Sequence, residues 1–275
     1  MIGDRRRGQT AKRVAQKERA APRPSEGIGI RMDATHWDAR YRASELVWGL
    51  APNRFVAAEL ADLPPGRALD VACGEGRNAI WLASRGWHAT GLDFSDAAID
   101  RARRLATEAG VAERAAFLVA DVVAGVMAEP PTTAAGAAAA GPANANAGVD
   151  AGAGAGAGTS GDDGLPPTAA FDAVVVAYLQ LPADARRAAL RAAAGRLAPG
   201  GTLLVVAHDA TNLTDGVGGP RDASVLYTPD GTAADLADIP GLVIEKAARV
   251  PRPVETPDGE ATAIDTLVRA RLAPA

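Results

Sequence analysis

The sequence predicts an α/β fold, a doubly wound and mostly parallel seven-stranded sheet that ends in an antiparallel hairpin and carries helices on both faces. Apolar, strand-like runs alternate with helix-like segments from residue 51 to residue 208, which is the pattern of a parallel sheet covered on both faces. The last two strand-like runs, 242–250 and 261–272, are instead joined by a Pro-Asp-Gly turn at 257–259. We therefore expect them to form the closing hairpin.

The elements before the hairpin are each bounded by turn residues or by a change of hydrophobic period. In chain order they are a helix at 51–63, a strand at 67–72, a helix at 77–86, a strand at 88–93, a helix at 96–110, strands at 115–120 and 171–177, a helix at 183–197, a turn at 198–201 and a strand at 202–208. Ser95 precedes the third helix and is its expected N-cap.

The strand at 67–72 leads into a glycine-containing loop. Gly74 and Gly76 can take positive φ and let the backbone approach a ligand closely. Residues 74–79 also satisfy the G-x-G-x-x-G/A pattern of dinucleotide-binding folds, in which a helix N-terminus holds a pyrophosphate. Asp70 and Glu75 argue against that interpretation, because their charges would repel a pyrophosphate, whereas Asp70 would attract a ligand ammonium group. A carboxylate that caps local amides is the alternative for Asp70.

Two further carboxylates follow at the ends of the next two strands. Asp93 lies nineteen residues after Gly74, and Asp121 follows the strand at 115–120. Open α/β sheets bind ligands at the carboxyl ends of their strands, and a carboxylate placed there accepts two hydroxyl protons bidentately. Three acids spaced one per β-α unit thus outline a site for a nucleoside cofactor.

With these motifs the chain resembles the class I S-adenosylmethionine-dependent methyltransferases, whose fold is Rossmann-like. The likeness runs from about residue 35 to the C-terminus with one large interruption, and it is greatest to the small bacterial tellurite-resistance and thiopurine methyltransferase groups. It implies S-adenosyl-L-methionine as cofactor. It also implies methyl transfer to a small-molecule acceptor, such as a thiol or a chalcogen compound.

The resemblance implies roles for individual residues as well. Asp70 and the loop from Gly74 to Gly76 would hold the methionine part of the cofactor. Asp93 would accept both ribose hydroxyls, Phe94 would lie against the adenine, and Asp121 would accept the adenine amino group. The remaining expected cofactor contacts lie beside these residues or at a neighbouring strand end, and they are Ala72, Cys73, Asn78, Ser95, Val122 and Ala177. Cys73, the single cysteine, is expected to be a packed side chain and not a nucleophile.

Four segments are expected to surround the acceptor. They contribute Trp37, Tyr41 and Trp48 from the N-terminal part, Tyr178 after the strand at 171–177, His208 at the end of the strand at 202–208, and Arg221 and Tyr227 from a glycine-rich segment expected to be mobile. The N-terminal aromatics form a lid or simply pack on the sheet edge. Tyr178 shapes the pocket or donates a hydrogen bond.

His208 is the candidate catalytic acid or base, because imidazole titrates near neutral pH; a structural histidine is the alternative. The adjacent Asp209 would point to the opposite face of the strand. The sequence therefore identifies no orienting acid for His208 and favours an acceptor that ionises by itself.

The chain departs from the tellurite-resistance enzymes in its hairpin, where residues 253–256 replace a His-Arg pair. Arg221 and Arg252 remain to attract an anion, so the acceptor stays open. Three scattered histidines and one cysteine give no metal-ligand spacing.

We expect a single domain that spans residues 32–275. Two segments do not belong to its expected core, one before the domain and one inserted within it. Residues 1–31 hold nine Lys or Arg and three Asp or Glu, which predicts a disordered basic arm. Two explanations of this arm stay open. It is an upstream extension, since Met32 precedes the family-like sequence, or it is a segment that binds nucleic acid or an anionic membrane. Twenty of the 25 residues at 134–158 are Ala or Gly, which predicts a disordered loop inside an insertion at about 128–168.

Composition and charge are consistent with a cytoplasmic enzyme. The formal net charge is −4, no stretch is long and apolar enough to span a bilayer, and the basic arm lacks the apolar region of a signal peptide. One cysteine fits a reducing compartment. We expect no membrane partner, and a nucleic-acid partner is disfavoured.

Two other functions remain open. One is a nicotinamide-dependent oxidoreductase, against which stand Asp70, Asp121, the hairpin ending and the lack of a Tyr-x-x-x-Lys pair. The other is a cofactor- or partner-binding protein without catalysis.

Overall fold

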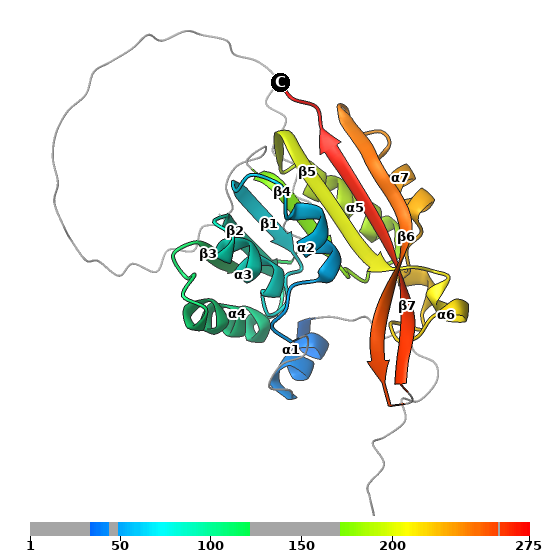
Figure 1. The fold of residues 1–275 in the computed structure, drawn as a ribbon, viewed down its shortest axis with the longest axis horizontal. Helices are drawn as coiled ribbons and strands as arrows, with labels where there is room; N and C mark the ends of the chain where they lie inside the picture. Colours follow the sequence, from blue (N-terminus) through cyan, green and yellow to red (C-terminus); the bar gives the residue numbers. More distant parts are fainter. Residues whose placement is uncertain (1–33, 44–48, 122–170, 258) are drawn as a thin grey trace, which may run out of the picture. The chain divides into compact units, whose positions relative to one another are not determined.

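The computed structural model describes residues 34–43, 49–121, 171–257 and 259–275, which all belong to one compact unit (Figure 1). The predicted basic arm and the predicted insertion at about 128–168 lie outside the described residues. Trp48 and Val122 lie outside them as well.

Seven strands form one sheet, as the sequence predicts. They are β1 (Arg67–Val71), β2 (His88–Asp93), β3 (Ala115–Val119), β4 (Phe171–Ala177), β5 (Leu197–His208), β6 (Leu242–Thr256) and β7 (Gly259–Leu272). Their spatial order is β3-β2-β1-β4-β5-β7-β6. The first five strands are parallel, and β7 is antiparallel to both β5 and β6, so the predicted fold class and the closing hairpin are confirmed.

Helices cover both faces of this sheet. They are α1 (Ala34–Ala43), α2 (Arg54–Leu60), α3 (Arg77–Ser84), α4 (Asp96–Glu108), α5 (Ala183–Ala194), the short α6 (Asn212–Asp215) and η1 (Ala223–Val225), and α7 (Pro229–Leu236). Figure 1 shows α2, α3 and α4 on one face and α5 and α7 on the other. None of the helices in the described ranges combines the length and hydropathy needed to span a bilayer.

Two apolar cores follow from the alternation of side chains along the central strands. On β5, Leu203 and Val205 pack toward α5 and α7, whereas Leu204 and Val206 pack toward α2, α3 and α4. All four side chains are fully buried. Such a sheet, apolar on both faces, fixes where each strand ends and therefore where the polar residues after each strand lie.

Several predicted boundaries are wrong by a few residues. Helix α2 begins at Arg54 and not at 51, because the Asn53 side chain accepts hydrogen bonds from the amides of Phe55 and Val56 and caps the helix there. The predicted turn at 198–201 lies inside β5 as an irregularity, where Gly200 has φ 80° and the register against β4 shifts. Helix α7 is not among the helices that the sequence predicts.

Candidate functional site

Two non-glycine residues adopt left-handed backbone conformations at the carboxyl ends of neighbouring strands. Ala72 follows β1 with φ 56°, and Tyr178 follows β4 with φ 59°. Strands β1 and β4 are paired, so the two residues lie at the same edge of the sheet. Such conformations are unfavourable for residues with a Cβ and persist where the surrounding structure enforces them, which is common at functional sites. Gly74 and Gly76 have φ 54° and 79°, as the sequence predicts.

Asp70, on β1, carries a buried and uncompensated carboxyl group. The residue is 1% exposed, and neither carboxyl oxygen has a hydrogen-bond partner within the described part of the chain. Burial raises the pKa of Asp70 to about 7, against weaker opposing effects from the Asn78 side chain and the charge of Arg77. A cation or ammonium group of a ligand would satisfy this carboxylate, so the site fits the positively charged cofactor that the sequence suggests.

Asp93 closes the glycine loop from the end of β2. One carboxyl oxygen accepts a hydrogen bond from the amide of Gly74 at 2.9 Å, and the other accepts one from the amide of Ser95 at 3.0 Å. Burial raises the pKa of Asp93 despite these hydrogen bonds. Each oxygen retains a second lone pair, so the pair of oxygens can still accept hydrogen bonds from a diol.

Ser95 is the N-cap of α4, as the sequence predicts, since its hydroxyl accepts a hydrogen bond from the amide of Ala98. The same hydroxyl donates to Asp38 on α1. Because Ser95 is fully buried and its hydroxyl is used in both ways, the side chain positions α1 and α4.

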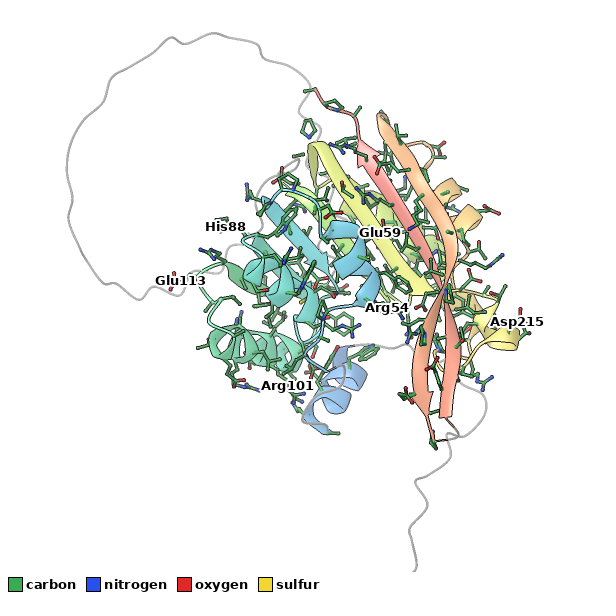
Figure 2. The ribbon with its side chains drawn as sticks, viewed as in Figure 1. Arg54, Glu59, His88, Arg101, Glu113 and Asp215 are labelled. Atoms are coloured by element: carbon green, nitrogen blue, oxygen red, sulfur yellow. The ribbon has the colours of Figure 1, made fainter. Side chains whose placement is uncertain are left out.

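Helix α1 is held beside the glycine loop through one arginine of α4. Arg101 pairs with the buried Glu75 at 2.6 Å and also donates to the carbonyl of Tyr41 at 2.8 Å (Figure 2). The Glu75 charge, which the sequence analysis weighed against a pyrophosphate, is thus neutralised by Arg101. Trp37 lies against Tyr41 with ring centroids 5.8 Å apart, and Tyr41 is 4% exposed.

Asn78 connects the loop to the start of α2. Its side-chain oxygen accepts a hydrogen bond from the amide of Asn53 at 2.9 Å, across 25 residues of sequence. Asn78 is buried and acts on the pKa of Asp70. The start of α2 is therefore joined to the helix that follows the glycine loop.

A second carboxylate at this edge, Asp265 on β7, is the centre of a polar cluster that the sequence analysis missed. Asp265 Oδ2 accepts hydrogen bonds from Arg252 Nε at 2.7 Å and from the Tyr178 hydroxyl at 2.8 Å. Asp265 Oδ1 lies 3.3 Å from His208 Nδ1, and the rings of His208 and Tyr178 lie 4.7 Å apart. We call these four residues, Tyr178, His208, Arg252 and Asp265, the Asp265 cluster.

The cluster holds Asp265 ionised although the residue is fully buried. Burial alone would raise the pKa of Asp265, but hydrogen bonds from His208, Arg252 and Tyr178 and the charge of Arg252 outweigh it and leave the pKa below its ordinary value. Burial and the charge of Asp265 raise the pKa of Tyr178 well above that of a free tyrosine. Tyr178 is thus a neutral hydrogen-bond donor at physiological pH.

Asp209, next to His208, does not contact it. The Asp209 carboxylate accepts hydrogen bonds from Thr266, Thr211 and Arg249, so the predicted opposite orientation is confirmed. The expectation that His208 lacks an orienting acid is nevertheless wrong, because Asp265 faces it from the antiparallel partner strand.

Arg77 lies near Asp70 and near two residues of the Asp265 cluster, Tyr178 and Arg252. Burial lowers the pKa of Arg77, which is also close enough to Asp70 and Arg252 for their charges to act on it. This one side chain therefore links the glycine loop to the Asp265 cluster. Asp70 and the cluster both lie at the carboxyl edge of the parallel strands.

Tyr227 and Arg221, expected near the acceptor, are placed differently. Tyr227 is 1% exposed, and its hydroxyl donates to the carbonyl of Leu179 at 2.5 Å inside the core beside α5 and α7. It supports the chain after β4 and does not present its hydroxyl to the site. Arg221 is exposed. The backbone from 218 to 227, predicted to be mobile, is held by the hydrogen bond from Asn212 to the carbonyl of Gly218 at 2.9 Å and by the bridge between Asp209 and Tyr227.

The other predicted cofactor residues lie at the same carboxyl edge. Phe94 follows β2, Asp121 follows β3 and is exposed, and Ala177 ends β4. Cys73 is buried, and burial together with the charges of Asp70 and Asp93 raises the pKa of its thiol, so the thiol stays protonated.

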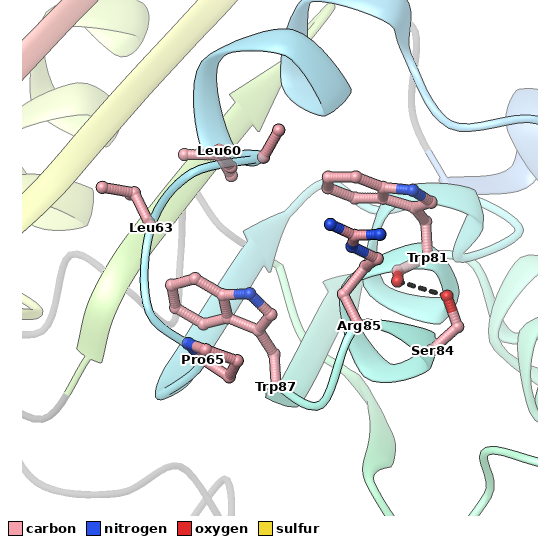
Figure 3. Close-up of a pocket in the computed structure, with 8 residues that line it drawn as sticks. Leu60, Leu63, Pro65, Trp81, Ser84, Arg85 and Trp87 are labelled. Atoms are coloured by element: carbon pink, nitrogen blue, oxygen red, sulfur yellow. Dashed lines mark hydrogen bonds between the residues drawn. The ribbon is translucent and has the colours of Figure 1, made fainter.

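A cavity of about 330 Å³ lies at the opposite, amino edge of the sheet, where the chain enters β1 and β2 (Figure 3). Leu60, Leu63, Trp81, Arg85 and Trp87 line it. It shares no residue with the site described above.

Comparisons with known proteins find similarity in part of the sequence and in the fold. Residues 68–140 match the family described as "Methyltransferase domain". Over 71 residues, a quarter of the chain, the sequence is 35% identical to "Probable thiol methyltransferase 2" of Arabidopsis thaliana. The matched stretch spans 31%, about a third, of the length of that curated relative.

Solved structures match over most of the chain at low identity. The structure described as "Conversion of a Disulfide Bond into a Thioacetal Group during Echinomycin Biosynthesis" is 22% identical, with a TM-score of 0.59 over 87% of this chain and 92% of that chain. TehB from Haemophilus influenzae is 14% identical, with a TM-score of 0.55 over 87% and 66%. The N-methyltransferase NodS from Bradyrhizobium japonicum, in complex with S-adenosyl-L-homocysteine, is 16% identical, with a TM-score of 0.54 over 87% and 98%. At these identities the likeness establishes the fold.

Proposed function

We propose that this chain, a class I S-adenosylmethionine-dependent methyltransferase by its fold and by the family of its residues 68–140, binds S-adenosyl-L-methionine and methylates a small-molecule nucleophile. The observation that carries the proposal is the uncompensated Asp70 carboxylate beside the glycine loop. S-adenosylmethionine carries an ammonium group and a sulfonium centre, and a buried carboxylate without partners attracts such a cation more strongly than it could in water.

Within this proposal each part of the glycine loop has a physical task. Asp70 faces the ammonium group, and Asp93, fixed by the amides of Gly74 and Ser95, accepts the ribose hydroxyls. Phe94 lies against the adenine, and Asp121 accepts the adenine amino group. Because the sulfonium is itself a strong electrophile, what the chain must supply is alignment of the acceptor with the methyl group.

The proposed acceptor is a small sulfur or chalcogen nucleophile. This choice of acceptor is supported by the similarity of a quarter of this chain to an Arabidopsis protein named as a probable thiol methyltransferase. The Asp265 cluster, beside the proposed donor site, supplies the polar groups that such an acceptor would meet.

Calorimetric titration tests the first half of the proposal. We expect S-adenosylmethionine and S-adenosylhomocysteine to bind and NAD not to bind; binding of NAD instead would favour the oxidoreductase alternative. A methyl-transfer screen over thiols, selenite, phenols and amines tests the second half. Cofactor binding with no product from any acceptor class would favour the non-catalytic alternative.

A further inference from the structure

The Asp265 cluster fixes the orientation of an imidazole. Within the described ranges His208 Nδ1 and Asp265 Oδ1 are both buried without a hydrogen-bond partner, and they face each other at the ion-pair distance of 3.3 Å. Since an ionised carboxylate only accepts hydrogen bonds, a proton on His208 must reside on Nδ1 to face it. The neutral imidazole then carries its basic lone pair on Nε2.

The ring is held on two further sides. Tyr178 packs against it from β4, and a Cβ on Gly219 would come within 3.1 Å of its Cγ and Nδ1 atoms. The Gly219 position lies nearest the Cγ, Nδ1 and Cδ2 atoms of the ring, and Nε2 is not among its three nearest atoms. His208 keeps 15% of its side chain exposed, and no described residue forms a hydrogen bond with Nε2.

Charged groups surround the pair formed by His208 and Asp265. Arg252 already pairs with Asp265 at 2.7 Å, so the carboxylate is balanced before the imidazole takes up a proton. Asp265 nevertheless stabilises the imidazolium that forms, as an orienting carboxylate does. Arg77, on the side of the glycine loop, interacts with Tyr178 and Arg252 of the cluster, and Asp209 is bonded to Arg249 and Thr266 on the opposite face.

We infer that His208 is a general base oriented by Asp265, and that the acceptor is a nucleophile that still carries its proton at neutral pH, such as an alkyl thiol, and not a permanently ionised chalcogen oxyanion. This inference rests on the proposed methyl-transfer function. A lone pair on the acceptor sulfur would form the new bond to the methyl carbon, and the bond from that carbon to the donor's sulfonium would break with its electron pair going to the donor sulfur. The acceptor's S–H bond would break with its electron pair staying on the acceptor sulfur. The proton passes to Nε2 of His208 and then to water.

The first experiment compares two thiols at pH 7, benzyl mercaptan, which is protonated, and 4-nitrothiophenol, which is ionised. His208→Gln should lower kcat for benzyl mercaptan by about 100-fold to 10,000-fold, the usual contribution of a general base. The loss for 4-nitrothiophenol should be at least about ten times smaller, because that acceptor has no proton to remove. His88→Gln, which changes an exposed histidine at the start of β2, is the matched control and should change neither rate.

The second experiment reads the tautomer directly by ¹⁵N NMR of the imidazole groups in the S-adenosylhomocysteine complex. We expect the Nδ1-protonated tautomer for His208, and a loss of that preference in Asp265→Asn and, more weakly, in Tyr178→Phe. In Asp265→Asn the acid limb of the pH profile of kcat should change while KM stays nearly constant, which a purely structural role for Asp265 would not produce.

The outcomes separate this inference from the proposed function. Failure of the wild-type protein to bind S-adenosylhomocysteine contradicts the proposed function. Binding together with equal losses for the two thiols in His208→Gln, or with an Nε2-protonated His208, overturns the inference. The tautomer result decides it even where neither thiol is methylated.

Discussion

Asp70 and Asp265 are two buried carboxylates at the same edge of the sheet, and their surroundings are opposite. Asp70 is 1% exposed and has no hydrogen-bond partner among the described residues. Asp265 is fully buried and faces Arg252, Tyr178 and His208. The pKa of Asp70 is raised to about 7, whereas that of Asp265 is lowered.

The difference indicates which half of the site depends on a ligand. A buried charge without partners is unfavourable in the free protein, so in the proposed function a cationic ligand completes the Asp70 half. The Asp265 half is internally balanced, and its charges serve to position His208. Four measurements test this contrast, taken from the largest expected effect to the smallest.

Asp265→Ala should have the largest effect on stability. It leaves the partly buried Arg252 unpaired and removes the partner of two further side chains, which should lower the free energy of unfolding by about 3 to 5 kcal/mol at pH 7. Because the folded-state pKa of Asp265 is lowered, its contribution is present above about pH 4 and is lost as pH falls below that value. Urea unfolding at pH 7 and pH 3 measures this. An equal difference at both pH values would contradict the assigned charge.

Asp93→Ala should weaken binding of S-adenosylhomocysteine by roughly 2 to 4 kcal/mol, since it removes two charge-assisted hydrogen bonds to the ligand. Calorimetry measures the loss, and circular dichroism checks that the fold is intact. Asp100→Ala, on the exposed side of α4, is the matched control and should bind normally. Unchanged affinity in Asp93→Ala would remove Asp93 from the proposed ribose site.

Asp70→Asn should stabilise the free protein while it weakens the cofactor complex. The raised pKa means that the wild-type protein loses stability as pH rises from about 4 to about 7, because the unfolded chain releases this proton first. The variant lacks that loss and should gain about 1 to 3 kcal/mol at pH 8. In the wild type, S-adenosylhomocysteine should bind more tightly as pH rises through 7, because its ammonium group favours the ionised carboxylate. Thermal unfolding at pH 5 and pH 8 with calorimetry measures both effects, and a destabilised variant at pH 8 would contradict them.

Replacement of residues 134–158 by a short Gly-Ser linker should have the smallest effect. Twenty of its 25 residues are Ala or Gly, so the segment can bury little apolar area in a core. The affinity for S-adenosylhomocysteine should not change, and stability should rise by no more than about 0.6 kcal/mol per halving of the loop length. Loss of binding would show that the segment belongs to the site.

The glycine loop could be predicted because its residues are close to one another in the sequence. Asp70, Gly74 and Gly76 lie on one strand and its following turn, and Asp93 lies at the end of the next strand. Since parallel strands joined by helices end at one edge, their order along the chain already places these residues together. The same holds for the N-cap Ser95, whose partner is three residues away.

The sequence by itself thus determined the fold class, the seven strands and the carboxylates of the glycine loop, because each depends on local periodicity or on the ends of consecutive strands. Only the tertiary structure decided the Asp265 cluster and the burial of the Tyr227 hydroxyl in the core. Tyr178 and Asp265 are 87 residues apart, and His208 meets Asp265 only through the antiparallel register of β5 and β7. A shift of one residue in that register would turn Asp265 to the other face of the sheet, and no local pattern in the sequence specifies it.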